Sequence, residues 1–345
     1  MKRFTLLLTT ILFSTGMAGC SSNGENETSG ETNEVSDETT EMDFGHVLVE
    51  ESTYQVTAEH MAESINEATD GEIALNIFPH SQLGSETTML DSLIQGSQTF
   101  QFAALPALED MISELQIMNI PYLFDSTEQT LEVLNGEVVG EMISEELEEQ
   151  GLVDLGWIVA ERNIFTASEP IESLEDMQSQ NLRVLQTPSY IATYEALGAQ
   201  PTGIDYGELY MAAEQGVVDG GDVTPEQFID DRFVDIADYY NITRVHQQPL
   251  LLVMSKTVYD GLTPEQQEII TESAEQGIEL GVDFYYQSFE ESLEEMEEEG
   301  TQIIEPNLTE FQEATQDVTE DIIENTPNGQ EWYDAIQEEI ENTNL

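Results

Sequence analysis

The chain has 345 residues, and its 72 Asp and Glu outnumber its seven Lys and Arg so far that the formal net charge at pH 7 is −65. A field of this sign repels nucleic acid and anionic membranes, which excludes both as partners. Its self-repulsion should destabilise the fold in dilute buffer, whereas about 1 M salt shortens the Debye length to roughly 3 Å. We therefore expect a halophile's protein, or alternatively an acid-rich exterior protein of an alkaliphile.

Residues 1–20 are typical of a secretion signal, because Lys2 and Arg3 precede an apolar run too short to span a bilayer as a stable helix. The run ends in Met-Ala-Gly-Cys, which resembles the lipobox of a bacterial lipoprotein. In such proteins the cysteine, here Cys20, is acylated and becomes the mature N-terminus. An ordinary signal peptide with a chance cysteine is the alternative.

Cys20 is the only cysteine, so lipidation would leave no thiol for a disulfide or for redox chemistry. A lipid there would anchor the protein to the outer face of the cell membrane, which suits an envelope without an outer membrane. Residues 21–43 contain Ser, Thr, Gly, Asn and acids with almost nothing to bury, and they predict a disordered tether.

Beyond the tether, the hydrophobic pattern alternates between periods of two and of 3.6 residues, which indicates an α/β protein with a largely parallel sheet. The first half predicts strands at 46–51, 72–79 and 100–106, and helices at 54–70 and from Ser85 to Gly96. The second half predicts strands at 156–161, 181–186 and 250–255, and helices from Ser173, at 190–197, at 206–215, from Thr224, from Thr263 to about 299, at 307–324 and at 329–341.

Motifs for catalysis and cofactor binding are absent from the sequence. It has no glycine-rich phosphate loop and no Gly-x-Ser-x-Gly elbow. Its histidines lie far apart in the sequence and give a metal site no support; they are His46, His60, His80 and His246. Paired carboxylates carry no information in so acidic a chain, so a catalytic dyad would go unseen. We expect no cofactor and no metal.

Few cations remain outside the signal: Arg162, Arg183, Arg232, Arg244 and Lys256. Their scarcity suggests roles that neutral or acidic residues cannot fill. Arg183 lies between apolar residues in the predicted strand 181–186, and arginine binds carboxylates through a planar two-pronged fork. A binding protein for an organic anion therefore fits better than an enzyme.

Several segments resemble the solute-binding proteins of TRAP transporters, the DctP-type family, in order and spacing over about residues 44–340. They are FPHSQLGSE (78–86), IPYLFDSTEQTLEVLNGEVVGE (120–141), PIESLEDMQSQNLRV (170–184), YIATYEALGAQPTGIDYGELYMAAEQGVVDGGDVTPEQF (190–228) and LLVMSKTVYDGLTPEQQEII (251–270). The resemblance implies a receptor that delivers an organic acid to one small and one large membrane subunit.

The resemblance also implies the fold, which is a two-lobed α/β structure of the periplasmic-binding-protein type II class. Crossing strands would join the lobes, and the long helix from Thr263 would bridge both. We expect one lobe at 44–160 plus 250–289 and the other at 161–249 plus 290–345. The cleft between them would close on the ligand like a hinge.

Arg183 matches the family arginine that pairs with the substrate carboxylate, and Arg162 matches a second arginine that often assists. A buried ion pair is the structural alternative for both. Tyr206 matches an aromatic position over the ligand, although it could equally be a core aromatic. We assign Arg232, Arg244 and Lys256 to structural roles.

The chain departs from the family after Val-Asp-Gly, where an asparagine usually faces the ligand. Here Asp222, Val223 and Thr224 occupy this region. Val223 removes a hydrogen-bond partner that Thr224 could supply after a small shift, and this puts the substrate in doubt. A zwitterionic compatible solute such as ectoine is one alternative ligand, and an extracellular sensory module or hydrolase is the less favoured alternative function.

Overall fold

The computed structural model describes residues 39–178 and 180–343, which belong to one compact unit. The predicted signal peptide, Cys20 and the tether up to residue 38 lie outside the described residues. Among the described helices, none is both long and apolar enough to cross a membrane.

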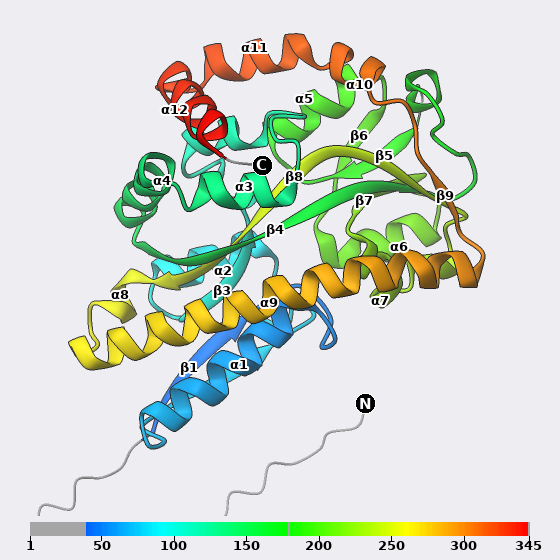
Figure 1. Ribbon diagram of the computed structural model, residues 1–345. Helices are drawn as coiled ribbons and strands as arrows, with labels where there is room; N and C mark the ends of the chain where they lie inside the picture. The colour runs from blue at the N-terminus through cyan, green and yellow to red at the C-terminus, as the bar shows by residue number, and fades with distance from the viewer. Residues whose placement is uncertain (1–38, 179, 344–345) are drawn as a thin grey trace, which may run out of the picture. The chain divides into compact units, whose positions relative to one another are not determined.

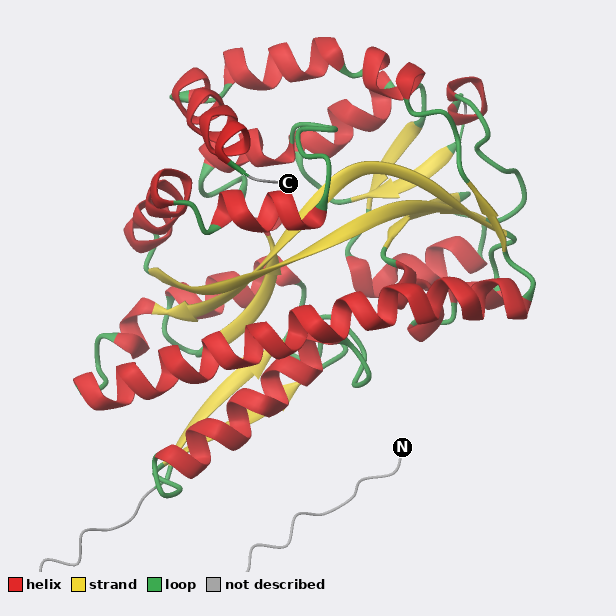
Figure 2. Cartoon of the chain, viewed as in Figure 1, coloured by secondary structure: helices red, strands yellow, loops and turns green. Residues whose placement is uncertain are grey.

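A mixed sheet of nine strands runs through the described chain, in the order β2-β1-β3-β8-β4-β7-β5-β6, with β9 beside β8 (Figure 2). The β1, β5 and β9 pairings are parallel, but β8 runs antiparallel to β3 and β4, and β7 antiparallel to β4. Our expectation of a largely parallel sheet was therefore only partly right. The strands are β1 (Thr40–Gly45), β2 (Ile73–Phe78), β3 (Phe100–Ala104), β4 (Leu152–Thr166), β5 (Asn181–Val184), β6 (Gln200–Gly203), β7 (Gly220–Val223), β8 (Tyr239–Ser255) and β9 (Gln302–Ile304).

The first strand lies earlier than we predicted. β1 begins at Thr40, inside the segment assigned to the tether, and the predicted strand 46–51 is bends and turns. Met42 and Phe44 of β1 are buried, and each residue of the strand pairs with β2. The strand pattern of Met42 and Phe44 is short and is obscured in the sequence by the acidic residues beside it. The apolar residues of 46–51 belong instead to the loop that connects β1 to α1.

Strands β4 and β8 cross the whole sheet and pair with each other along most of their length (Figure 1). They have 15 and 17 residues, where the sequence predicted short strands at 156–161 and 250–255. Their extensions carry polar residues that break the apolar pattern but are buried here, such as Asn163, Asn241 and Gln248. Burial of these side chains by tertiary contacts overrides the local pattern.

The predicted helices are present with small boundary shifts. Thr263 caps the longest of them through a capping box with Gln266, Pro264 is its first residue, and Gly300 ends it in the left-handed region (φ 102°). The predicted start at Ser173 gives only a 3₁₀ turn, Leu174–Met177. The α-helices are α1 (Thr53–Ala68), α2 (Glu86–Ile94), α3 (Thr127–Leu134), α4 (Glu137–Glu149), α5 (Pro188–Ala196), α6 (Leu209–Glu214), α7 (Pro225–Asp230), α8 (Lys256–Tyr259), α9 (Pro264–Glu299), α10 (Thr309–Ala314), α11 (Gln316–Asn325) and α12 (Gly329–Asn342).

Four clusters of buried hydrophobic residues surround the sheet. Two are built mainly from residues before Ala160 and from β8 and α9, and two mainly from residues 164–245. The C-terminal helices contribute to clusters of both kinds. Phe311 of α10 packs in a cluster built mainly from residues 164–245, whereas Trp332 and Ile336 of α12 pack with α3 and α4 in a cluster built mainly from residues before Ala160. The lobe boundaries stay a prediction.

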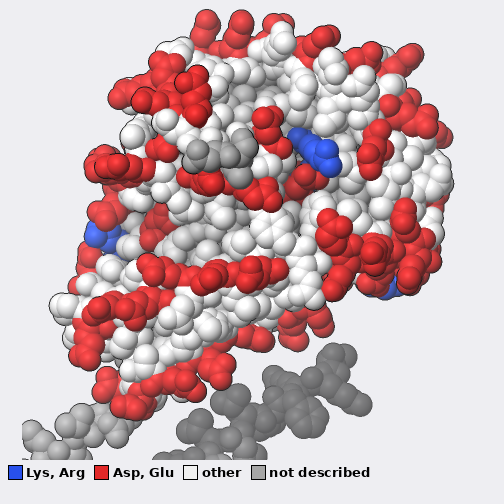
Figure 3. Space-filling model, in the orientation of Figure 1, with Lys and Arg blue, Asp and Glu red and all other residues white. Residues whose placement is uncertain are grey.

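Acidic side chains are spread over the whole of the face seen in Figure 3, and Lys and Arg appear there only as isolated patches. Three of the described cations are partly or largely exposed, and each forms an ion pair with a nearby acid. The pairs are Arg232 with Asp235, Arg244 with Glu161 and Lys256 with Asp260. Exposed pairs of this kind contribute little to stability, because water and salt screen them.

Candidate ligand-binding site

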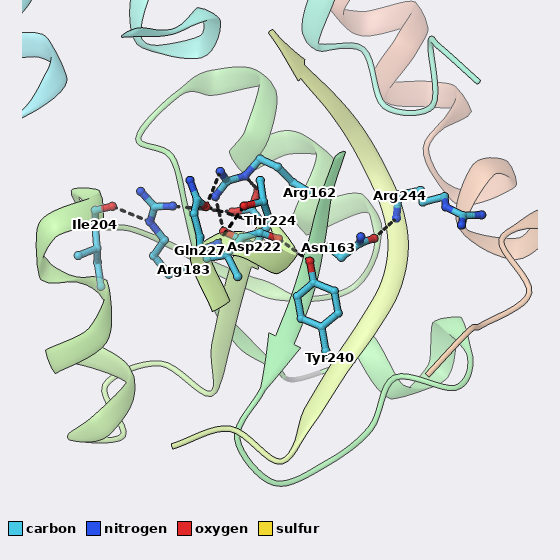
Figure 4. Close-up of polar contacts among 10 residues, drawn as sticks. Arg162, Asn163, Arg183, Ile204, Asp222, Thr224, Gln227, Tyr240 and Arg244 are labelled. Atoms are coloured by element: carbon cyan, nitrogen blue, oxygen red, sulfur yellow. Dashed lines mark hydrogen bonds and ion pairs between the residues drawn. The ribbon is translucent and has the colours of Figure 1, made fainter. Parts of the chain in front are cut away.

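Arg162 and Arg183 are brought together by three neighbouring strands. Arg162 lies in β4 and Arg183 in β5, and between them runs β7, which carries Asp222. The arginines are 5% and 1% exposed, and Asp222 is 1% exposed. Figure 4 shows the two guanidinium groups near Asp222 and Gln227. The two buried cations of the described chain therefore share one carboxylate.

The hydrogen-bonding capacity of Arg162 is largely used within the protein. Its Nε donates to Asp222 Oδ2 at 2.8 Å, its Nη2 donates to the Asp222 carbonyl oxygen, and its Nη1 donates to Gln227 Oε1 at 3.2 Å. The same Gln227 oxygen accepts from the backbone N–H of Thr224. Arg162 is thus held rigidly by groups of β7 and α7.

Arg183 is bound far less completely. Its Nε donates to the carbonyl oxygen of Ile204 at 2.8 Å, but Nη1 and Nη2 have no hydrogen-bond partner among the described residues. The nearest carboxylate oxygen, Asp222 Oδ1, is 3.8 Å from Nη1, and the Tyr206 ring lies 5.8 Å from the guanidinium carbon. A buried guanidinium with two free nitrogens is costly unless a ligand binds it, and its open fork matches a carboxylate.

The ionisation of Asp222 depends on the two arginines beside it, Arg162 and Arg183. Burial by itself raises the pKa of Asp222, but Arg162 and Arg183 outweigh burial and hold that pKa below its usual range. Both arginines stay protonated, because guanidinium groups do not lose their proton in proteins. Asp222 is therefore an ionised carboxylate at neutral pH, and it neutralises one of the two positive charges.

Two adjoining cavities open onto the arginines. The inner one, of about 20 Å³, is lined by both arginines together with Tyr54, Gln227 and Gln248. The outer one has about 660 Å³ and includes Arg183 but not Arg162 in its wall. The outer volume is within the range of small-molecule sites. The residues common to both walls are Val47, Glu86, Arg183, Leu185 and Tyr206.

Glu86 lies in the wall of both cavities and was not among the predicted site residues. It is the first residue of α2, and its Oε1 accepts from the backbone N–H of Ala104 at 3.0 Å. Withdrawal from water raises the pKa of Glu86, which favours the neutral acid. Among 72 acids, no sequence signal distinguishes this one. Tyr54, Gln227 and Gln248 were missed for the same reason, since none stands out by residue type.

The other predicted residues are placed differently. Tyr206 lines both cavities, and its hydroxyl donates to Asp231. Val223 packs in a hydrophobic cluster with Phe228, and the hydroxyl of Thr224 caps α7, so neither side chain lines these cavities.

Local backbone features fix the position of the arginines. At Gly220, a Cβ would lie 1.9 Å from the carbonyl oxygen of Phe165, so only glycine lets β7 approach β4. The β4–β8 register shifts directly after Arg162, where residues 242–245 have no ladder partner and Arg244 adopts a positive φ of 46°. Bulges of this kind re-aim side chains near functional sites.

The profile of the family described as "Bacterial extracellular solute-binding protein, family 7" (DctP) matches residues 44–326. The chain belongs to this family. Membership assigns it a binding role outside the cytoplasm and not a catalytic one, as the sequence predicted.

Similar proteins agree with this assignment. A TRAP periplasmic solute-binding protein from Sulfitobacter sp., solved with bound β-D-galacturonate, is 27% identical and has a TM-score of 0.84 over 87% of this chain and 100% of that chain. A 2,3-diketo-L-gulonate-binding periplasmic protein of Escherichia coli is 23% identical over 86% of this chain and 90% of its own. A C4-dicarboxylate-binding protein of Bacillus subtilis is 25% identical over 73% and 72%. The α/β fold with a long helix is thus the fold of TRAP solute-binding proteins.

Proposed function

We propose that this protein is the receptor of a TRAP transporter, that it captures a small organic acid, and that it delivers the acid to the small and large membrane subunits. The ligand carboxylate binds the two terminal nitrogens of Arg183. Arg162, which is held in place by Asp222 and Gln227, adds a second positive charge nearby. The observation that carries this proposal is the buried Arg183 guanidinium, which belongs to a residue that lines both cavities and whose two terminal nitrogens have no hydrogen-bond partner among the described residues.

The wall of the outer cavity contains residues from the segments assigned to both predicted lobes. Glu86 and Val47 come from the segment assigned to the first lobe, and Arg183 and Tyr206 from the segment assigned to the second. Closure of the lobes about β4 and β8 would bury the ligand between them. On the outer face of the cell membrane, a lipid on Cys20 would keep the receptor near its permease.

The chemistry of the ligand is left open by the relatives, which include proteins named for sugar acids and for C4-dicarboxylates. Both classes offer a carboxylate to Arg183. A zwitterion such as ectoine would use the same arginine, and it stays the alternative.

Thermal unfolding in about 2–3 M salt, where distant charges are screened, tests the proposal against sugar acids, dicarboxylates, ectoine and neutral sugars. A ligand at 1,000 times its Kd adds about 4 kcal/mol, which raises Tm by roughly 8 °C or more for a chain of this size. We expect carboxylates alone to raise Tm.

The matched variants are Arg183→Ala, Arg183→Lys and the exposed Arg232→Ala. Loss of a desolvated charge pair costs about 2–5 kcal/mol, so Arg183→Ala should abolish the shift and Arg183→Lys should leave part of it, because lysine keeps the charge but loses the fork. Arg232→Ala should behave as wild type. A shift that survives in a folded Arg183→Ala variant, or one caused by neutral sugars, would contradict the proposal.

A further inference from the structure

We infer that two buried acids, Glu226 and Glu109, act as clasps that hold the two predicted lobes closed over the ligand and so set how long the ligand stays bound. Each acid binds the first turn of a helix in the other predicted lobe. Neither acid lines the inner or the outer cavity, so both act on the closed form without touching the ligand. The inference rests on the proposed function, because it assumes that the lobes close over a bound acid.

The first clasp joins Glu226 of α7 to the start of α1. Its Oε1 accepts from the backbone N–H of Thr53 at 2.7 Å, and its Oε2 accepts from the hydroxyl of Thr53 at 2.7 Å. Thr53 is the first residue of α1, where backbone N–H groups have no partner within the helix and negative charge is favourable. Both residues are buried. Helix α1 is therefore capped in part by an acid 173 positions later in the chain.

The second clasp joins Glu109 to the start of α5. Glu109 follows the 3₁₀ turn Leu105–Leu108 in the segment assigned to the first lobe. Its Oε1 accepts from the hydroxyl of Ser189, and also from the side-chain amide of Asn119 at 2.8 Å. Ser189 is buried in the first turn of α5, whose N-cap residue Thr187 makes no side-chain capping hydrogen bond. Each predicted lobe therefore supplies one acid and one helix start.

The two sides of each clasp belong to different hydrophobic clusters. Helix α1 and the turn before Glu109 contribute to the clusters built mainly from residues before Ala160. The buried aromatic residues of α5 and α7 contribute to the clusters built mainly from residues 164–245. Movement of one lobe away from the other would therefore break both clasps.

Both clasps lie beside the cavities in the sequence. The residue that follows each member of the first clasp lines the inner cavity, and these residues are Tyr54 and Gln227. Gln227 also accepts a hydrogen bond from Arg162. Beside the second clasp, Asp110 and Thr187 line the outer cavity. The closed form is thus held at points one or two residues away from the walls of the ligand site.

Water can replace the bonds of the clasps when the lobes part. The carboxylates, the hydroxyls and the backbone N–H of Thr53 then become hydrated, so closure exchanges bonds to water for bonds within the protein. Such an exchange stabilises the closed form only modestly, although a charged acceptor strengthens each bond. We therefore expect the lobes to stay closed only when the ligand adds bonds of its own.

The clasps should slow the release of the ligand and leave its capture unchanged. The ligand enters the open form, in which neither clasp exists, but it leaves only after the lobes have opened. Loss of a clasp should therefore raise the dissociation rate constant, koff, and leave the association rate constant, kon, unaltered. A bond that merely supports the fold would instead lower the Tm of the ligand-free protein and leave both rate constants unchanged.

Stopped-flow kinetics in roughly 2–3 M salt test the clasps on the whole protein. The probes are D-galacturonate, succinate and any further acid that raises Tm in the thermal screen. We expect Glu226→Ala to raise koff about tenfold or more and Ser189→Ala about threefold or more, because Glu226 makes two of the bonds and Ser189 makes one. The kon should stay within about twofold of wild type, and the ligand-free Tm should not change.

Double variants separate the clasps from each other. Thr53→Ala and Glu226→Ala break the same clasp, so together they should release the ligand no faster than Glu226→Ala alone. Glu226→Ala and Ser189→Ala break different clasps, so their effects on koff should multiply. Glu63→Ala, an exposed change on α1, is the matched control and should leave koff unaltered.

The outcomes tell failure of the clasps from failure of the proposed function. Binding that is lost in Arg183→Ala, but released at the wild-type rate by folded Glu226→Ala, would overturn the clasps and leave the receptor function intact. A lower ligand-free Tm with an unchanged koff would do the same. If Glu226→Ala does not fold, Thr53→Ala and Ser189→Ala decide, and an unchanged koff in both would overturn the inference. An absence of binding by every acid of the screen would overturn both proposals.

Discussion

Glu109 shows what burial does to a single carboxyl group in this acidic chain. It is 2% exposed, its Oε1 accepts from Asn119 and from Ser189, and its Oε2 has no partner among the described residues. Burial raises its pKa to about 7, although the hydrogen bonds from Ser189 and Asn119 lower it. The folded protein therefore holds a proton on Glu109 that the unfolded chain releases near pH 4.5.

We predict that Glu109→Gln reduces the loss of stability at alkaline pH. Between pH 4.5 and 7 the folded state binds more protons at Glu109 than the unfolded state, so this group makes stability fall as the pH rises through that window. The glutamine does not titrate, and its amide can keep the bonds to Asn119 and Ser189. The difference in free energy of unfolding, variant minus wild type, should therefore be larger at pH 8 than at pH 5 by on the order of 1–3 kcal/mol.

Chemical denaturation at the two pH values measures this difference. Glu268→Gln on the exposed face of α9 is the matched control, and it should show no pH-dependent gain. If Glu109→Gln and wild type lose stability in parallel from pH 5 to 8, Glu109 is ionised in the folded state and the argument is wrong.

Individual residues of the site could be predicted from the sequence only where their residue type is rare in this chain. Arg183 and Arg162 stood out because so few cations remain, and the structure brings them to one carboxylate. Glu86 and Glu109 are among 72 acids, and the surroundings that make the first half-buried and the second buried come from strands and helices distant in sequence, which no local pattern records. The ligand roles of Arg183, Arg162 and Tyr206 stay predictions until binding is measured.

Helices α1 and α9 pack side by side through glycines (Figure 1). A Cβ on Gly281 would lie 2.3 Å from Thr57 Oγ1 and 2.8 Å from Ile158 Cδ1, and one on Gly277 would lie 3.1 Å from Met61 Cγ. Glycine is a poor helix former, about 1 kcal/mol worse than alanine. Its presence in the middle of a 36-residue helix therefore reflects close contact with α1 and β4.

We predict that Gly281→Ala destabilises the protein in spite of the better helix propensity. Overpacking costs typically 1–3 kcal/mol, and at contacts this short it should exceed the roughly 1 kcal/mol gained by alanine. Thermal unfolding should show a lower Tm. Gln276→Ala, at an exposed position of the same helix, should leave Tm unchanged or raise it slightly. A Tm for Gly281→Ala at or above wild type would mean that α1 moves aside without cost.

Element starts and ends were predictable where capping chemistry marks them. Thr263 with Pro264 and Gln266 gave the start of α9, and Thr224 with Pro225 gave α7, because caps are local in sequence. Strand lengths and directions were not, since β4 and β8 continue through polar residues that only tertiary burial accommodates. The start of β1 was missed because its pairing with β2 lies 33 residues away along the chain, at Thr40 and Ile73.

At the scale of the whole molecule, the net charge of −65 predicts a requirement for salt. The acids lie mostly on the surface (Figure 3), and the exposed cations offset few of them. Screening is already strong at about 1 M, where the Debye length is roughly 3 Å. We therefore expect Tm to rise steeply with NaCl up to about that concentration and to flatten beyond it.

A titration of Tm against NaCl from about 0.05 to 3 M distinguishes screening from preferential exclusion of salt. Exclusion continues to raise stability in proportion to concentration, so sodium sulfate at equal ionic strength serves as the comparison. A Tm that does not change with NaCl, or that rises linearly over the whole range, would contradict screening as the source of stability.

The long pairing of β4 with β8 also sets when this chain is able to fold. The two strands begin at residues 152 and 239, and each hydrophobic cluster combines segments that are more than 100 residues apart. Nucleation must wait for these distant segments, and such non-local topologies fold slowly. The N-terminal half therefore remains without a complete core until β8 is present. A nascent chain of this topology therefore exposes the apolar residues of its N-terminal half until residues 239–255 have been synthesised.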